Sequence, residues 1–153
     1  MIIFENSDKA DFSMQFFNPD GSGGMMCGNG GRSIVKFAAD KDIIKERCCF
    51  IAPDGLHFAT IKDNIVSLKM VNPTLFQAHQ DGYYINTGTS HFVVFENSLN
   101  EIDIIKKGRA LRYDERFSPY NGCNVNFVEE ISANNLNIQT YERGVEDETL
   151  ACG

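Results

Sequence analysis

Short apolar segments alternate with polar turns along most of the chain, a pattern typical of strands joined by hairpins. Turn-forming residues such as Pro53-Asp54-Gly55 separate the segments. The pattern predicts strands at 1–7, 12–18, 47–52, 56–62 and 65–70, and then at 82–87, 90–96, 124–131 and 136–142. The segment 71–76, "VNPTLF", is expected to lead from a first structural unit into a second.

Two segments have helical rather than alternating spacing. Residues 28–41 carry Ile34, Val35 and Ala38 on one helical face, so a helix is expected to begin near Cys27 or Gly28. Residues 100–112, "NEIDIIKKGRALR", form a second predicted helix. Many short strands with one or two helices predict an α+β fold with a largely antiparallel sheet.

Composition narrows the class of protein. The 153 residues suffice for one ordinary domain or two small ones, and 42% hydrophobic with 23% charged residues is typical of a globular protein. No apolar run reaches the length of about 20 residues that spans a membrane, and the acidic opening "MIIFENSDKADF" does not resemble a signal peptide. The expected location is therefore the cytoplasm. The net charge of -7 argues against nucleic acid or anionic membrane as a partner.

The five cysteines are an odd number without Cys-x-x-Cys spacing, which argues against both a disulfide framework and a zinc site. No metal is expected. Cys48 and Cys49 lie in an apolar strand and, with Cys123, are expected to be buried. Cys27 and Cys152 differ, because each precedes a glycine in a polar, turn-rich segment.

The first of these segments, "DGSGGMMCGNGGR", has the features of a reactive thiol site. A cysteine in the first turn of a helix lies at the positive end of the helix dipole, which favours the thiolate. Glycines after it allow an anion to approach the backbone N–H groups. More commonly, however, such a segment contains a buried structural cysteine beside a glycine-rich turn. Similarly, Arg143 near Cys152 could hold a carboxylate or could be a surface ion-pair partner.

Taken together, "FNPDGS", "MCGNGGR" and "YERGVEDETLACG" resemble diaminopimelate epimerase, and "GTSHFVVF" and "NVNFV" extend the resemblance along the chain. The resemblance implies two pseudo-symmetric domains, at 1–73 and 74–153, each a mostly antiparallel sheet or barrel around a central helix. It also implies interconversion of LL- and meso-diaminopimelate, a step in lysine and peptidoglycan precursor biosynthesis, without pyridoxal phosphate or any other cofactor.

The resemblance assigns roles residue by residue. It implies that Cys27 and Cys152 act on opposite sides of the substrate α-carbon, one as thiolate and the other as thiol. Two further residues, His91 and Glu142, are expected near the reacting centre, and Arg143 is expected to hold the distal carboxylate. The expected substrate-binding residues are Asn18, Gly28, Asn29, Thr89, Asn124, Glu142, Arg143 and Gly153.

The chain also departs from the family pattern. Family members commonly read Gly-Asn-Pro-His where this chain has Gly88-Thr89-Ser90-His91, so Thr89 replaces a binding asparagine. The "GVEDE" loop is slightly longer than usual. Compared with the family, residues before Met1 and after Gly153 are expected to be missing. Residues 1–153 alone are therefore expected to be inactive or nearly so, because Cys152 would have no helix behind it.

Two other functions remain open from the sequence. A proline-racemase-like enzyme would also use two cysteines, but that family more often reads Cys-Gly-His and has no "YERG". A non-catalytic protein that keeps the fold is an alternative of a different class. The expected partner is a small-molecule substrate, and a homodimer is left open.

Overall fold

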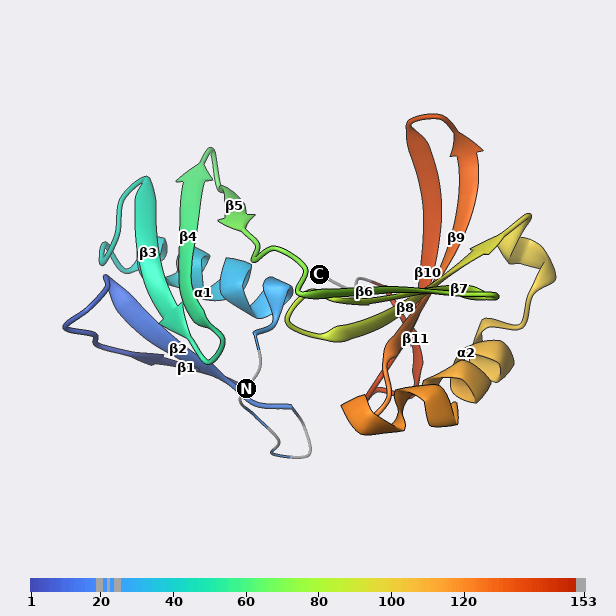
Figure 1. Ribbon diagram of the computed structural model, residues 1–153. Helices are drawn as coiled ribbons and strands as arrows, with labels where there is room; N and C mark the ends of the chain where they lie inside the picture. The colour runs from blue at the N-terminus through green and yellow to red at the C-terminus, as the bar shows by residue number, and fades with distance from the viewer. Residues whose placement is uncertain (19–20, 22, 24–25, 151–153) are drawn as a thin grey trace. The chain divides into compact units, whose positions relative to one another are not determined.

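The computed structural model describes residues 1–18, 21, 23 and 26–150, and the chain forms two compact units. The first unit comprises Met1–Val71, and the second begins at Asn72 (Figure 1). Within the described ranges, no helix is both long and apolar enough to cross a membrane.

The first unit is a five-stranded sheet in the order β1-β2-β3-β4-β5. Its strands are β1 (Ile2–Glu5), β2 (Phe12–Phe16), β3 (Arg47–Ala52), β4 (Gly55–Lys62) and β5 (Ile65–Lys69). Neighbouring strands are antiparallel except β2 and β3, which are parallel. A parallel pair needs a crossover connection, and the helix α1 (Gly28–Asp40) lies within it.

Helix α1 packs against β4 and β5 through one apolar face. Val35 and Ala38 are fully buried in this interface. On the sheet side, Phe12 and Phe50 are also fully buried and stack with ring centroids 5.1 Å apart. Apolar side chains at helical spacing therefore meet apolar side chains at strand spacing, which is the pattern the sequence predicts for this unit.

The second unit is a six-stranded sheet in the order β11-β10-β9-β8-β7-β6. Its strands are β6 (Leu75–His79), β7 (Gly82–Asn86), β8 (Ser90–Glu96), β9 (Asn124–Ser132), β10 (Asn135–Glu142) and β11 (Asp147–Thr149). All neighbours are antiparallel except β8 and β9. The predicted α+β class with mostly antiparallel sheets is confirmed.

The crossover between β8 and β9 holds three short helices. They are the 3-10 helix η1 (Leu99–Glu101), helix α2 (Ile104–Arg112) and the 3-10 helix η2 (Glu115–Tyr120). Helix α2 packs on β9 and β10, where Gly108 lies against the ring of Tyr141. An added Cβ at Gly108 would approach Tyr141 Cγ to 2.6 Å, so this close contact requires glycine.

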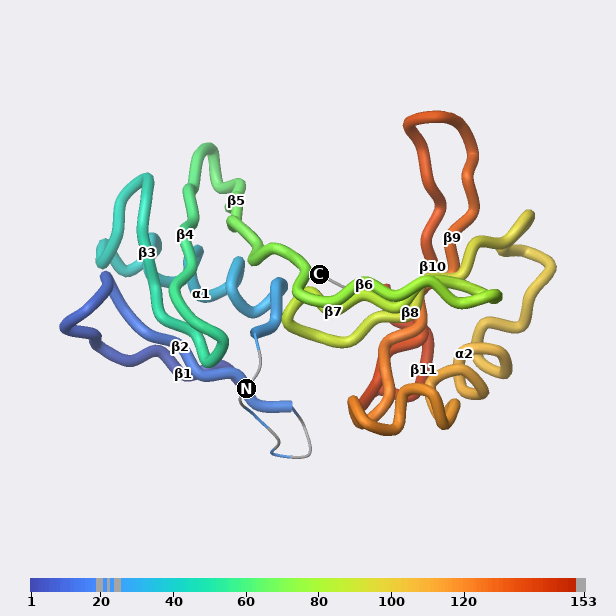
Figure 2. The backbone as a smooth tube through the Cα atoms, in the orientation of Figure 1, coloured from blue at the N-terminus to red at the C-terminus, as the bar shows by residue number. Residues whose placement is uncertain are grey.

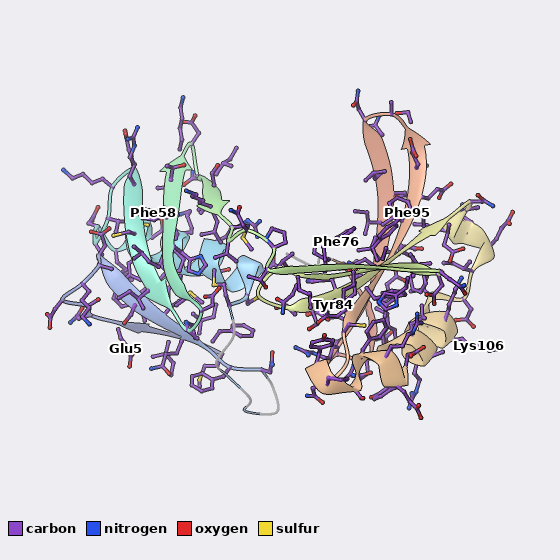
Figure 3. The ribbon with its side chains drawn as sticks, in the orientation of Figure 1. Glu5, Phe58, Phe76, Tyr84, Phe95 and Lys106 are labelled. Atoms are coloured by element: carbon purple, nitrogen blue, oxygen red, sulfur yellow. The ribbon has the colours of Figure 1, made fainter. Side chains whose placement is uncertain are left out.

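The two faces of the second sheet differ. Figure 3 shows Tyr84 on one side and Phe76 and Phe95 on the other. Tyr84 is fully buried, and its hydroxyl lies 2.8 Å from Ser90 Oγ. Phe76 and Phe95 are exposed. The hairpin of β9 and β10 extends beyond the other strands as a long ribbon (Figure 2).

Some sequence predictions were wrong in detail. The predicted helix at 100–112 is broken at Asp103, whose side chain caps α2 by accepting the N–H of Lys106 at 2.9 Å. The segment 71–76 was expected only as a crossing, yet β6 begins within it at Leu75. Burial is confirmed for Cys48 and Cys123, but Cys49 is only half-buried, because adjacent strand residues point to opposite faces.

Candidate functional site

Cys27 is the N-cap residue of α1. Its backbone is extended, with φ −113° and ψ 119°, and its Sγ accepts the backbone N–H of Gly30 at 3.4 Å. The thiol is half-buried. It lies where the first backbone N–H groups of the helix have no partners within the helix itself, a position suited to anions.

The glycines after Cys27 have a packing role in the structure. Gly28, Gly30 and Gly31 are buried. A Cβ added to Gly31 would lie 2.4 Å from Met26 Cε and 2.9 Å from Leu68 Cδ2. Gly31 therefore allows the first turn of α1 to lie close against the core, and this fixes the position of the Cys27 cap.

Asn18 and Asn29 are the other predicted binding residues of the first unit. Asn18 is half-buried, and its carbonyl accepts the N–H of Gly21 at 3.0 Å. Asn29 is exposed in the first turn of α1, and its carbonyl accepts the Ser33 hydroxyl at 2.9 Å. Asn18 and Asn29 lie on either side of Cys27 in the sequence.

The cysteines of the folded protein are expected to differ in reactivity. Burial, followed by the nearby Asp11, raises the pKa of Cys48 to about 11, and burial raises the pKa of Cys123 to about 12. Their thiolate fractions at pH 8 are then about 10⁻³ and 10⁻⁴. We expect iodoacetamide at pH 8 to modify the half-buried Cys27 before Cys48 and Cys123, as measured by peptide mass mapping.

The control is iodoacetamide labelling of the protein unfolded in urea, in which all the cysteines should react. Labelling of Cys123 as fast as Cys27 in the folded protein would contradict the prediction, because it would mean that the second unit opens readily.

Polar side chains gather on the second sheet where β8, β9 and β10 lie side by side. The parallel register of β8 and β9 pairs His91 with Asn124, and the antiparallel register of β9 and β10 pairs Asn126 with Thr140. We call these residues, His91, Asn124, Asn126 and Thr140, the polar cluster. Its members face away from the buried side chains of Phe92 and Val125.

Hydrogen bonds join the polar cluster. His91 Nδ1 lies 2.8 Å from Asn126 Oδ1, and Asn126 Nδ2 donates to Thr140 Oγ1 at 2.7 Å. Burial holds the pKa of His91 below its ordinary value, and the positive charge of Arg143 adds to this effect. The Asn126 hydrogen bond and the charge of Glu142 oppose it but are outweighed.

Arg143 follows β10 and is fixed at both its backbone N–H and its guanidinium group. Its N–H donates to Asn124 Oδ1 at 2.9 Å, and its Nη1 donates to the carbonyls of Tyr120 and Gly122 at 3.1 and 3.4 Å. Among the described residues, Nε and Nη2 have no hydrogen-bond partner. Nη1 is thus anchored, and the Nε–Nη2 edge can donate two parallel hydrogen bonds to a carboxylate.

The turn after Arg143 is stabilised by Glu146, which the sequence did not single out. Glu146 Oε1 lies 3.2 Å from Arg112 Nε and accepts the N–H of Gly144, and Oε2 accepts the Tyr141 hydroxyl at 3.2 Å. Although burial acts to raise it, the pKa of Glu146 is lowered by these donors. The "GVEDE" loop is therefore stabilised by the ion pair between its Glu146 and Arg112.

The other predicted residues of the second unit lie near this region of the chain. Glu142 ends β10 and is half-buried. Thr89 is half-buried in the turn between β7 and β8, where its carbonyl accepts the N–H of Thr87 at 3.1 Å. Cys152 and Gly153 lie outside the described residues.

Sequence reasoning did not single out Asn126, Thr140, Arg112 or Glu146. A signal for Asn126 was available, because it is two residues from Asn124 and must face the same side of a strand. Thr140, Arg112 and Glu146 depend on strand register and on the crossover, which one sequence does not specify.

No family model matches the chain. Curated relatives, however, match all of it. Diaminopimelate epimerase of Flavobacterium psychrophilum is 46% identical over 154 residues, covering 100% of this chain and 60% of the relative. The enzyme of Aquifex aeolicus is 40% identical, covering 100% and 59%, and that of Chlorobaculum tepidum is 37% identical, covering 100% and 62%. The chain thus spans about 60% of the length of these relatives, and the resemblance found in the sequence is confirmed.

Solved structures of lower identity show the same fold. The PhzF-family phenazine biosynthesis protein of Bacillus anthracis has a TM-score of 0.73 and 13% identity, covering 99% of this chain and 61% of that protein. A PhzF-family protein of Enterococcus faecalis has a TM-score of 0.62 and 14% identity, covering 99% and 60%. At these identities the likeness concerns the fold alone.

Proposed function

We propose that the protein at its natural full length carries out the α-carbon inversion that interconverts LL- and meso-diaminopimelate. Residues 1–153 resemble the diaminopimelate epimerases over their whole length. The observation that carries this proposal is the 46% identity to one such enzyme across the entire chain. The half-buried thiol at the N-terminus of α1 and the open guanidinium edge of Arg143 both fit it. The reaction supplies precursors for lysine and peptidoglycan.

In the proposed reaction Cys27 and Cys152 are the two acid/base groups. One thiolate removes the α-proton and becomes a thiol, and the other thiol donates its proton to the opposite face and becomes a thiolate. The net charge of the pair does not change, and the configuration of the carbon is inverted. The carbanion formed between these steps needs oriented donors, which backbone N–H groups at a helix N-terminus supply.

The other residues have proposed roles in binding and orientation. Arg143 binds the distal carboxylate of the substrate through its Nε and Nη2 edge. Glu142 and His91 are proposed to lie near the reacting centre. There they exchange protons with the reacting groups or orient them. Asn18, Gly28, Asn29, Thr89, Asn124 and Gly153 are the proposed remaining contacts to the substrate.

In this proposal, Thr89 is the residue whose effect on substrate specificity most needs explanation, because it replaces a family asparagine. Its hydroxyl donates and accepts through a single oxygen, whereas the family asparagine has an NH₂ donor and a separate carbonyl acceptor on a longer side chain. Because the chain keeps Arg143 and Asn124, we infer that these two residues carry most of the recognition of the distal end.

The proposed setting is the cytoplasm, where amino-acid and cell-wall precursors are assembled. The proposed partner is the small-molecule substrate, with a second copy of the chain as a further candidate. The net charge of -7 on residues 1–153 disfavours nucleic acid and anionic membranes as partners.

The test is isotope exchange in the protein at its natural full length. We expect incubation with LL-diaminopimelate in D₂O to produce meso-diaminopimelate with deuterium at the inverted α-carbon, measured by mass spectrometry and NMR. L-Proline, tested in parallel, should give no exchange. Exchange of proline instead would favour the racemase alternative, and binding of diaminopimelate without exchange would favour a non-catalytic protein.

A further inference from the structure

A line of hydrogen bonds crosses three strands of the second sheet and ends at His91. The ring Nδ1 of His91 on β8 lies 2.8 Å from Asn126 Oδ1 on β9. The Nδ2 of the same amide donates to Thr140 Oγ1 on β10 at 2.7 Å. These three side chains come from residues 91, 126 and 140, so only the sheet register brings them together.

The orientation of the Asn126 amide determines where the neutral His91 ring carries its proton. An amide oxygen only accepts hydrogen bonds, and an amide nitrogen only donates them. Because Oδ1 faces the ring, Nδ1 must be the donor. A neutral imidazole has one N–H, so Nε2 then carries the lone pair.

Thr140 is the second hydrogen-bond partner of the Asn126 amide. If the amide turned by half a revolution, Nδ2 would face the ring and the proton of a neutral His91 would have to move to Nε2. Thr140 Oγ1 accepts from Nδ2 in the observed orientation, and its hydroxyl could donate to Oδ1 after such a rotation. The tautomer therefore follows from the orientation of the Asn126 amide in the structure. Thr140 is buried, with 4% of its surface exposed, so water does not readily replace it as the acceptor.

We propose that Asn126 is a positioning residue that holds neutral His91 in the Nδ1-protonated form, leaving Nε2 as a proton acceptor. The tautomer itself does not depend on the enzymatic activity. Its use in catalysis rests on the proposed function, in which His91 lies near the reacting centre.

The charged groups acting on His91 are consistent with a neutral ring. Arg143 disfavours the imidazolium and Glu142 favours it, while burial is the largest influence and lowers the pKa of His91. Near neutral pH the ring is therefore mainly uncharged, and the choice of tautomer decides what Nε2 offers. A lone pair can take a proton from a thiol and later return it, whereas an Nε2–H group cannot accept a proton.

The experiment is long-range ¹H–¹⁵N NMR of the imidazole nitrogens in the ¹⁵N-labelled protein. The chain has three histidines, and His91→Gln identifies the His91 signals. We expect a protonated Nδ1 and an unprotonated Nε2 for His91. His57 is an internal reference of the opposite kind, because its Nε2 lies 2.8 Å from Asp54 Oδ1 and donates to that carboxylate.

Three variants test the cause. Asn126→Ala is expected to abolish the Nδ1-protonated signature. Asn126→Asp keeps the shape and can only accept when ionised, but its charge favours the imidazolium. At a pH where the ring is neutral, the signature should therefore persist. Asn137→Ala, on the exposed part of β10, should leave His91 unchanged.

An Nε2-protonated His91 in the unmodified protein would overturn the proposal, as would an unchanged tautomer in Asn126→Ala. If Asn126→Ala fails to fold, the tautomers of the unmodified protein and of Asn126→Asp still test the proposal, and loss of Nδ1 protonation in Asn126→Asp would contradict it. In an epimerisation assay, Asn126→Ala should lower kcat more than it raises KM, and Asn126→Asp should restore part of the loss. Absence of epimerisation with the expected NMR result would refute the proposed function and leave the tautomer assignment intact.

Discussion

Replacement of Cys27 by serine is expected to lower epimerisation by about 10²–10⁴-fold, the usual contribution of a general acid or base. Serine keeps an acceptor at the N-cap of α1, where Sγ now accepts the Gly30 N–H. A serine hydroxyl, however, is far less acidic than a thiol and cannot serve as the base. The rate is measured as α-deuterium incorporation into LL-diaminopimelate by the protein at its natural full length.

Cys49→Ser is the matched control for this change. Cys49 is also half-buried and lies in the first unit, but on β3 rather than at the start of α1. We expect it to retain activity, and circular dichroism should show both variants folded. A Cys27→Ser protein with undiminished exchange would refute the two-thiol mechanism.

Replacement of Arg143 by lysine is expected to raise KM for diaminopimelate by about 10- to 100-fold with a smaller change in kcat. Lysine keeps the charge but loses the fork that binds a carboxylate through two bonds. It also loses the anchoring bonds from Nη1 to the carbonyls of Tyr120 and Gly122. Steady-state kinetics in both reaction directions measures the effect.

Arg109→Lys is the control, because Arg109 is exposed on α2 of the same unit. It should leave both kinetic constants unchanged. If Arg143→Lys lowered kcat and left KM unaltered, Arg143 would act at the reacting centre and not at the distal carboxylate.

Local sequence patterns predicted most strands of the fold. Apolar alternation located β3, β4 and β5, because each is closed by a tight turn with its own signature, such as Asp63 and Asn64 in the left-handed conformation between β4 and β5. Helix α1 was predictable for a similar reason, since its buried face and its glycine-rich start lie within one continuous segment.

Features set by distant residues were not predictable. The parallel pairs β2–β3 and β8–β9 leave no local signal, because alternation is the same for parallel and antiparallel neighbours. The break between η1 and α2 depends on Asp103 acting as a cap, although the apolar spacing continues through it. Periodicity alone therefore predicted one helix where capping makes two.

The candidate site also contains one part that the local sequence predicts and another that depends on distant residues. Cys27 was located by its own segment, and its cap contact reaches only to Gly30. The bond network around His91 was not predicted, because it requires the register of three strands. Likewise, the ion pair of Arg112 and Glu146 joins the end of α2 to a turn 34 residues away.

This contrast has a consequence for the order of folding. The contact between Cys27 and Gly30 spans three residues and can form with the first turn of α1, whereas that between His91 and Asn126 spans 35 residues. Closing so long a loop carries an entropic cost that must be met before the contact contributes. During synthesis the environment of the Cys27 thiol can thus mature early, while the proton position on His91 becomes defined only after the crossover helices dock and β9 joins β8.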